Sequence, residues 1–267
     1  MVVDVDAAAA LLHPLIRRSR RLGLLPPRAL VCIPTDASAR ERDALVEAAG
    51  LAGASVVAVA PEPLAAALGA GLDLASPYAR MLVDIGSGVT DIAVIRAGRI
   101  ICSAALRTAC SDLEQAVRQH IASCHGLLLN PGEAGRLVMK AGLHPETGHE
   151  ALLTATGTRR QRVQVSIPVT DREIRRAMDP IIEKIVARIA GFLKDLPHSV
   201  ACEVIEDGIC LTGGGACLPG IVERIAAGTM LDVFPAANPL HAVIEGAARM
   251  LGAIDQFPNL ALKGVTS

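Results

Sequence analysis

The chain has 267 residues, of which 51% are hydrophobic and 20% charged, and its formal net charge at pH 7 is −1. This length and apolar content permit a sizeable buried core and exclude a disordered chain, and the balanced charge gives no overall attraction to polyanions. Aromatic residues make up only 1%, so few side chains can stack on bases, and no nucleic-acid partner is expected.

The first third of the chain alternates helical and strand patterns. The predicted elements are a helix over residues 7–22, a strand over 29–33, a helix over 38–49 that opens on a capping box, a strand over 55–60 and a helix from 64. This alternation is typical of an α/β layer with parallel strands.

From residue 81 the pattern changes to consecutive short strands up to residue 103, as in a meander. Further expected elements are a helix over 111–122, a helix start at 130–132, a polar loop at 144–148, a strand over 161–169, a helix capped by Thr170 and Glu173, a strand over 208–212 and a helix over 241–251. The capped helix carries one apolar stripe, predicted to face the core: Ile174, Met178, Ile181, Ile185, Ile189 and Phe192.

The seven cysteines lie mostly in apolar runs and form no C-x-x-C pair, and the histidines show no H-x-x-x-H spacing. We therefore expect free, buried thiols in a reducing compartment and no zinc site, with each histidine a surface or hydrogen-bonded side chain. Acidic residues near the N-terminus argue against a signal peptide. The apolar segment 56–75 is interrupted at 61–63, which predicts a strand and a helix rather than a membrane span in a cytoplasmic protein.

Two glycine clusters carry the functional signal. Residues 84–91 read Asp-Ile-Gly-Ser-Gly-Val-Thr-Asp between apolar runs, and 213–216 read Gly-Gly-Gly-Ala after another run. Small residues let backbone N–H groups approach a phosphate, and Asp84 can hold a hydrated divalent cation through water. Each cluster alone is typical of a tight turn, whereas the two together favour two lobes that close on one nucleotide.

With Pro-Glu-Pro-Leu-Ala-Ala-Ala-Leu-Gly over 61–69, these motifs resemble the actin and heat-shock-chaperone ATPase superfamily, and most closely the MreB-like bacterial actin homologues. The resemblance extends from about residue 8 to 255. It implies an α/β, actin-like (ribonuclease H-like) two-lobe ATPase fold with an incomplete first lobe. The implied division is a first-lobe remnant (1–79), a second-lobe core with the phosphate and adenosine loops (80–113 and 200–236), an inserted small subdomain (114–199), and a C-terminal helix and tail (237–267).

The resemblance also implies a site for ATP and Mg²⁺ between the lobes. Asp84 matches the residue that holds the hydrated Mg²⁺, Glu62 matches the glutamate that orients the attacking water, and Thr90 is the second expected catalytic residue. The expected cofactor-binding residues are Asp84, Gly86, Ser87, Gly88, Val89 and Thr90 in the phosphate loop, Gly213, Gly214, Gly215 and Ala216 beside the adenosine, and Lys140 near the base. On the residues alone, the alternatives are a polar turn residue for Glu62, a turn cap for Asp84 and a solvated charge for Lys140.

In this family slow ATP hydrolysis times the turnover of membrane-associated filaments that act in cell shape with the cell-wall elongation machinery. The resemblance thus implies self-association and a position at the inner face of the cytoplasmic membrane. Leu24 and Leu25 match the apolar loop that enters that membrane, and the basic cluster over 17–21 would favour anionic lipid. The alternative is a solvated helix end before a buried turn.

The sequence departs from the family pattern in nucleotide handling. The first phosphate loop, Asp-x-Gly-Thr, is absent, which predicts an N-terminally truncated member with weakened ATPase activity. Gly142 replaces the ribose-binding glutamate, and Ala-Cys-Ser at 109–111 replaces Gly-Gly-Asp. The open alternatives are a start encoded upstream, a truncated paralogue, a nucleotide-impaired scaffold, and a kinase or chaperone-type ATPase of the superfamily.

Overall fold

A computed structural model describes residues 4–19, 25–143, 150–159, 163–252 and 261–264. The chain divides into two compact units: Met1–Ala75 with His241–Ser267 form unit 1, and Ser76–Leu240 form unit 2. The loop expected at 144–148 and the first residues of the strand expected at 161–169 lie outside the described residues. Among the described helices, none combines the length and the apolar character that crossing a membrane requires.

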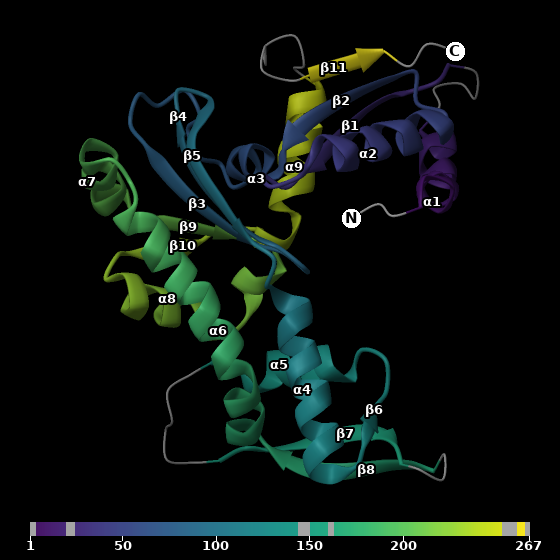
Figure 1. The fold of residues 1–267 in the computed structure, drawn as a ribbon, viewed down its shortest axis with the longest axis vertical. Coiled ribbons are helices and arrows are strands. Elements are labelled where there is room, and N and C mark those ends of the chain that lie inside the picture. The colour runs from purple at the N-terminus through teal and green to yellow at the C-terminus, as the bar shows by residue number, and fades with distance from the viewer. Residues whose placement is uncertain (1–3, 20–24, 144–149, 160–162, 253–260, 265–267) are drawn as a thin grey trace. The chain divides into compact units, whose positions relative to one another are not determined.

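Unit 1 contains α1 (Val5–Arg18), β1 (Arg28–Ile33), α2 (Ala39–Leu51), β2 (Val56–Pro61), α3 (Glu62–Gly69), α9 (Ala242–Gly252) and β11 (Ala261–Gly264). Strands β1 and β2 pair in parallel, as the alternating pattern predicted, and β11 pairs antiparallel with β2 (Figure 1). The predicted capping box of α2 is present, because the Ser38 side chain accepts from the Glu41 N–H and the Glu41 carboxylate accepts from the Ser38 N–H at 2.8 Å.

Helices α3 and α9 of unit 1 pack with their backbones close together. A Cβ atom added to Gly69 would lie closer than 3.0 Å to the Ala242 carbonyl, and one added to Gly246 would meet the Ala65 carbonyl equally closely. Glycine at both positions therefore permits the contact that joins the C-terminal helix to the first part of the chain.

Unit 2 begins with a sheet of order β10-β9-β3-β4-β5. Its strands are β3 (Arg80–Ile85), β4 (Thr90–Arg96), β5 (Arg99–Leu106), β9 (Ile209–Thr212) and β10 (Val233–Pro235). The predicted meander is confirmed, since β4 pairs antiparallel with both β3 and β5. On its other edge β3 pairs in parallel with β9, a partner more than a hundred residues away in the chain.

The rest of unit 2 contains a small antiparallel sheet and several helices (Figure 1). These elements are α4 (Cys110–His125), β6 (Leu128–Leu129), α5 (Glu133–Ala141), β7 (Leu152–Thr158), β8 (Gln164–Thr170), α6 (Asp171–Lys194), α7 (His198–Asp207) and α8 (Ile221–Thr229). Helices α4, α5 and α6 contact one another. The strands β6, β7 and β10 and the helix α7 were not predicted.

The core of unit 2 joins alternate residues of β3 and β4 to the apolar faces of α4 and α6. The stripe of α6 faces the core as predicted. Ile181 packs against it while only partly buried, and Ile182, which was not predicted, is buried at 1% exposure. The prediction of buried thiols is wrong for Cys124, Cys202 and Cys217, which are exposed, although all seven cysteines are free.

Candidate functional site

The first glycine cluster forms the hairpin turn between β3 and β4. The Gly86 N–H donates to the Val89 carbonyl at 3.0 Å, which closes the turn. Ser87 and Gly88 at its tip are exposed, and an added Cβ on Gly88 would meet open space. The tip therefore presents small residues whose backbone an anionic group can approach closely.

The N-terminus of α4 braces this turn. The Cys110 N–H donates to the Gly86 carbonyl at 3.3 Å, and the Ser111 N–H donates to the Ser87 carbonyl at 2.7 Å. Asp112 accepts from the Ala109 N–H at 2.9 Å and so occupies another donor of the first turn. These contacts satisfy helix N–H groups that would otherwise lack a partner, and they fix the shape of the turn. Residues 109–111, where the sequence departs from the family pattern, thus support the phosphate-loop candidate.

Asp84 is almost fully buried at the end of β3, with 6% of the residue exposed. Its Oδ1 accepts from the Thr212 hydroxyl of β9 at 2.8 Å, and it is the register partner of Asp91 on β4. Burial raises the pKa of Asp84 to about 6; the Thr212 hydrogen bond opposes this rise and the Asp91 charge adds to it. A buried carboxylate beside a second acid is an unfavourable place for negative charge, and a bound cation would relieve that cost.

The second glycine cluster packs directly against the end of β3. Gly213 has φ of 81°, a left-handed conformation that favours glycine, and its N–H donates to the Pro239 carbonyl at 2.9 Å. An added Cβ on Gly213 would lie 2.8 Å from Asp84 Oδ1, and one on Gly215 would overlap the Ile85 side chain. Both clusters therefore meet at the ends of two adjacent strands of unit 2.

Thr90 lies on the first position of β4 and is fully buried. Its hydroxyl donates to the Thr108 carbonyl at 2.8 Å, so its proton is held by the backbone. The Thr108 hydroxyl in turn accepts from Lys184 Nζ at 2.8 Å. Lys184 was not predicted, because it lies on α6, 76 residues away in the sequence, and no local motif marks it.

Lys140 and Ala216 also belong to unit 2. Lys140 is exposed near the end of α5, and the segment after it is joined to the loop that follows the second glycine cluster by a bond from the Leu143 N–H to the Pro219 carbonyl at 2.7 Å. Ala216 is buried within the 3₁₀ turn Gly214–Cys217.

The remaining predicted residues belong to unit 1. Glu62 is the first residue of α3, directly after β2, and is partly buried. Burial is the larger cause and the Glu62 charge the smaller one that together raise the pKa of the nearby Cys32 thiol to about 12. Leu25 is 64% exposed, whereas Leu24 lies outside the described residues.

Comparison with known proteins identifies the family. The MreB/Mbl protein family model matches residues 1–259. The chain is 31% identical over 264 residues to the cell shape-determining protein Mbl of Bacillus subtilis, covering 98% of this chain and 79% of that protein. It is 31% identical over 230 residues to the cell shape-determining protein MreB of Escherichia coli, covering 86% of this chain and 66% of that protein.

Solved structures show the same fold. MreB5 of Spiroplasma citri, bound to ADP, aligns with a TM-score of 0.88 and 26% identity over 96% of this chain and 78% of that one. The same protein bound to AMPPNP gives a TM-score of 0.87. A MamK double helical filament aligns with a TM-score of 0.75 at 18% identity, which supports the fold alone. The chain has an actin-like α/β fold and belongs to the MreB/Mbl family of bacterial actin homologues, whose curated members are cell shape-determining proteins.

Proposed function

We propose that this chain binds ATP with Mg²⁺ at the two glycine clusters of unit 2. The observation that carries the proposal is their meeting at the end of β3, where Gly213 leaves no room for a side chain beside Asp84. An exposed small-residue turn, a second glycine turn and a buried carboxylate are the parts that a phosphate and its metal ion require.

The residues divide by the part of the nucleotide they would hold. The backbone of residues 86–90 would bind the phosphates, residues 213–216 would lie beside the adenosine, and Lys140 would lie near the base. Asp84 would hold Mg²⁺ through water, which suits a single buried carboxylate because Mg²⁺ keeps most of its hydration shell. The bound ion would supply the positive charge that phosphoryl transfer needs on its oxygens.

Hydrolysis is the next step of the proposal. Glu62 would orient the attacking water, and Thr90, whose hydroxyl is tied to the backbone, would hold the phosphate turn in shape. Catalysis of this kind depends on positioning and electrostatics rather than covalent chemistry, so slow ATP turnover requires few catalytic side chains. Gly142 offers no carboxylate for a ribose hydroxyl, which weakens nucleotide affinity.

We further propose that the chain forms ATP-dependent filaments that act in cell shape with the cell-wall elongation machinery. Support comes from the names of its curated relatives and from the MamK filament of the same fold. Pelleting with and without Mg·ATP tests this. A nucleotide-driven filament is supported if the wild-type chain pellets only with Mg·ATP and the Asp84→Ala variant does not pellet. Pelleting that ignores both ATP and Asp84→Ala indicates a scaffold, and turnover of a small phosphate acceptor without polymer indicates a kinase.

The filament is proposed to lie at the inner face of the cytoplasmic membrane. Leu25 is 64% exposed, and α1 exposes Leu11 at 76% and Leu15 at 63%, one helical turn apart. Arg17 and Arg18 are exposed at the end of the same helix. Exposed leucines beside basic residues can enter the interface of an anionic bilayer.

Co-sedimentation with anionic vesicles tests the membrane contact. Leu25→Asp should weaken binding several-fold. Leu51→Asp is the matched control, because Leu51 is 59% exposed on α2 of the same unit. Equal binding by wild type and Leu25→Asp would contradict the contact.

A further inference from the structure

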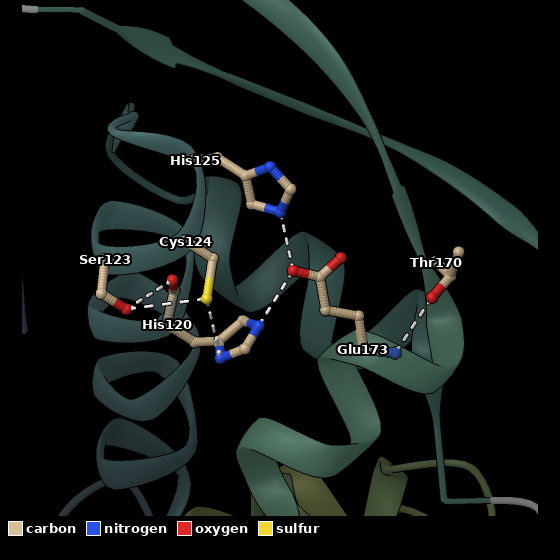
Figure 2. A network of polar contacts seen from close by, with 6 residues as sticks. All are labelled: His120, Ser123, Cys124, His125, Thr170 and Glu173. Atoms are coloured by element: carbon tan, nitrogen blue, oxygen red, sulfur yellow. Dashed lines mark hydrogen bonds and ion pairs between the residues drawn. The ribbon is translucent and has the colours of Figure 1, made fainter.

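A cluster of chemically reactive side chains lies at the end of α4, far from the glycine turns. His120, Cys124 and His125 on the last turns of α4 face Glu173 in the first turn of α6 (Figure 2). Glu173 Oε1 lies 2.9 Å from His120 Nε2 and 2.7 Å from His125 Nε2. Cys124 Sγ lies 3.9 Å from His120 Nδ1.

The local sequence explains why these groups converge. His120 and Cys124 are four residues apart, so they lie on one face of α4. Thr170 accepts from the Glu173 N–H at 3.1 Å, which caps α6. The Glu173 side chain turns toward the histidines (Figure 2).

The distances suit a metal ion. One ring nitrogen of His120, Cys124 Sγ and a carboxylate oxygen of Glu173 all lie within 4.8 Å of one another. Tetrahedral zinc with Zn–S of about 2.3 Å and Zn–N of about 2.0 Å sets its sulfur and nitrogen ligands about 3.5 Å apart. The distance of 3.9 Å between Cys124 Sγ and His120 Nδ1 is close to that value.

We propose that His120, Cys124 and Glu173 bind one Zn²⁺ ion, with water as the fourth ligand. A nitrogen, a thiolate sulfur and a carboxylate oxygen form a donor set that zinc accepts readily. Cys124 is exposed, and the His120 and Glu173 side chains are 30% and 23% exposed, so an ion can enter from solvent. Binding releases the Cys124 thiol proton to water, because the ligand is the thiolate. The bound ion links α4 to α6 within unit 2.

Helix α7 offers a matched control. His198 and Cys202 have the same spacing, with Cys202 Sγ 3.8 Å from His198 Nδ1, and Cys202 is also exposed. Within the described residues, however, the group around Glu173 is the one set of three such side chains that converges. The carboxylate of a second helix thus distinguishes the two pairs.

The experiment titrates the reduced full chain with Co²⁺ and then displaces the cobalt with Zn²⁺. One equivalent of Co²⁺ should produce a thiolate-to-cobalt charge-transfer band and tetrahedral d–d bands. Cys124→Ser should abolish the charge-transfer band. Glu173→Gln should lower the zinc affinity at least tenfold, because even the loss of a residue that only hydrogen-bonds a metal ligand lowers affinity by about tenfold or more. Cys202→Ser should match wild type. Circular dichroism confirms that each variant is folded.

Several results would overturn the proposal. These are no thiolate band in the folded wild-type chain, an unchanged band in Cys124→Ser, or an equal loss in Cys202→Ser. ATP binding measured in parallel keeps this question separate from the proposed nucleotide site. The proposed zinc site is also separate in space from the glycine turns. His120, its first ligand, lies nine residues beyond Ser111 on α4, which is about 14 Å along the helix at 1.5 Å per residue.

His125 is a positioning residue in this proposal, because its Nε2–H holds Glu173 Oε1. His125→Ala should lower the zinc affinity by about 10- to 100-fold, while the thiolate-to-cobalt band remains at saturating cobalt. His125→Asn retains an N–H donor and should recover part of that affinity. Equal affinity in wild type and His125→Ala would exclude this role.

Discussion

Replacing Asp84 by Asn should stabilise the nucleotide-free folded chain. The same substitution should remove the proposed Mg²⁺ contact. Burial raises the pKa of Asp84 from 3.8 to about 6 in the folded chain. At 1.36 kcal/mol per pKa unit, keeping this carboxylate ionised costs about 3 kcal/mol of folding free energy. Asn carries no charge, and its carbonyl can still accept the hydrogen bond that the Thr212 hydroxyl donates, so the substitution removes the cost and keeps the hydrogen bond.

The sign of the pH dependence follows from the raised pKa. The folded state holds the Asp84 proton at a higher pH than the unfolded state does, so this group's contribution to stability is complete below about pH 4 and is lost as the pH rises to about 6. The difference between Asp84→Asn and wild type should therefore be small below about pH 4 and approach 3 kcal/mol above about pH 7.

Urea unfolding followed by circular dichroism, without Mg²⁺ or nucleotide, measures this difference at each pH. Asp232→Asn is the control, because Asp232 is an exposed acid of the same unit. This substitution should change the free energy of unfolding by less than about 0.5 kcal/mol. If Asp84→Asn is less stable than wild type at neutral pH, the account of a costly buried charge is wrong.

Three further predictions concern packing and exposure. Gly215→Ala should cost about 1–3 kcal/mol in urea unfolding, because its Cβ would overlap Ile85, whereas Gly88→Ala should be neutral in stability yet weaken ATP binding. Gly69→Ala should destabilise unit 1 in a thermal melt, because its Cβ would overlap a carbonyl of α9; Gly252→Ala, which meets open space, should not. In the native chain a thiol reagent should label the three exposed cysteines well before the buried Cys210, and uniform labelling rates would contradict the described burial.

Local patterns predicted most of the regular elements. The capping residues Ser38 and Thr170 and the period of α6 marked helices, and the glycine turns marked the ends of β3 and β9. The strands β6 and β10 have only two and three residues, too few for a periodic pattern to mark them. Ile181 packs against the core but is only partly buried, whereas its neighbour Ile182 is fully buried, because a helical stripe specifies a face only to within about one residue.

Contacts distant in sequence could not be predicted from the residues alone. The bond from Thr212 to Asp84 and that from Lys184 to Thr108 join positions 128 and 76 residues apart. The cluster around Glu173 was missed for the same reason, since His120 and Cys124 have ligand spacing only once α6 supplies a carboxylate. Within a single helix the pair resembles His198 and Cys202, which no third such side chain of the described residues joins.

A titration of the full chain with a fluorescent ATP analogue and Mg²⁺ tests whether the two glycine clusters bind nucleotide. Asp84→Ala and Asp232→Asn would be titrated in parallel, with circular dichroism to confirm folding. We expect the wild-type chain to bind in the micromolar range, about −8 kcal/mol, with binding abolished in Asp84→Ala and retained in Asp232→Asn. A folded wild-type chain that binds no Mg·ATP, or an Asp84→Ala variant that binds it equally well, would contradict a nucleotide site at the glycine clusters.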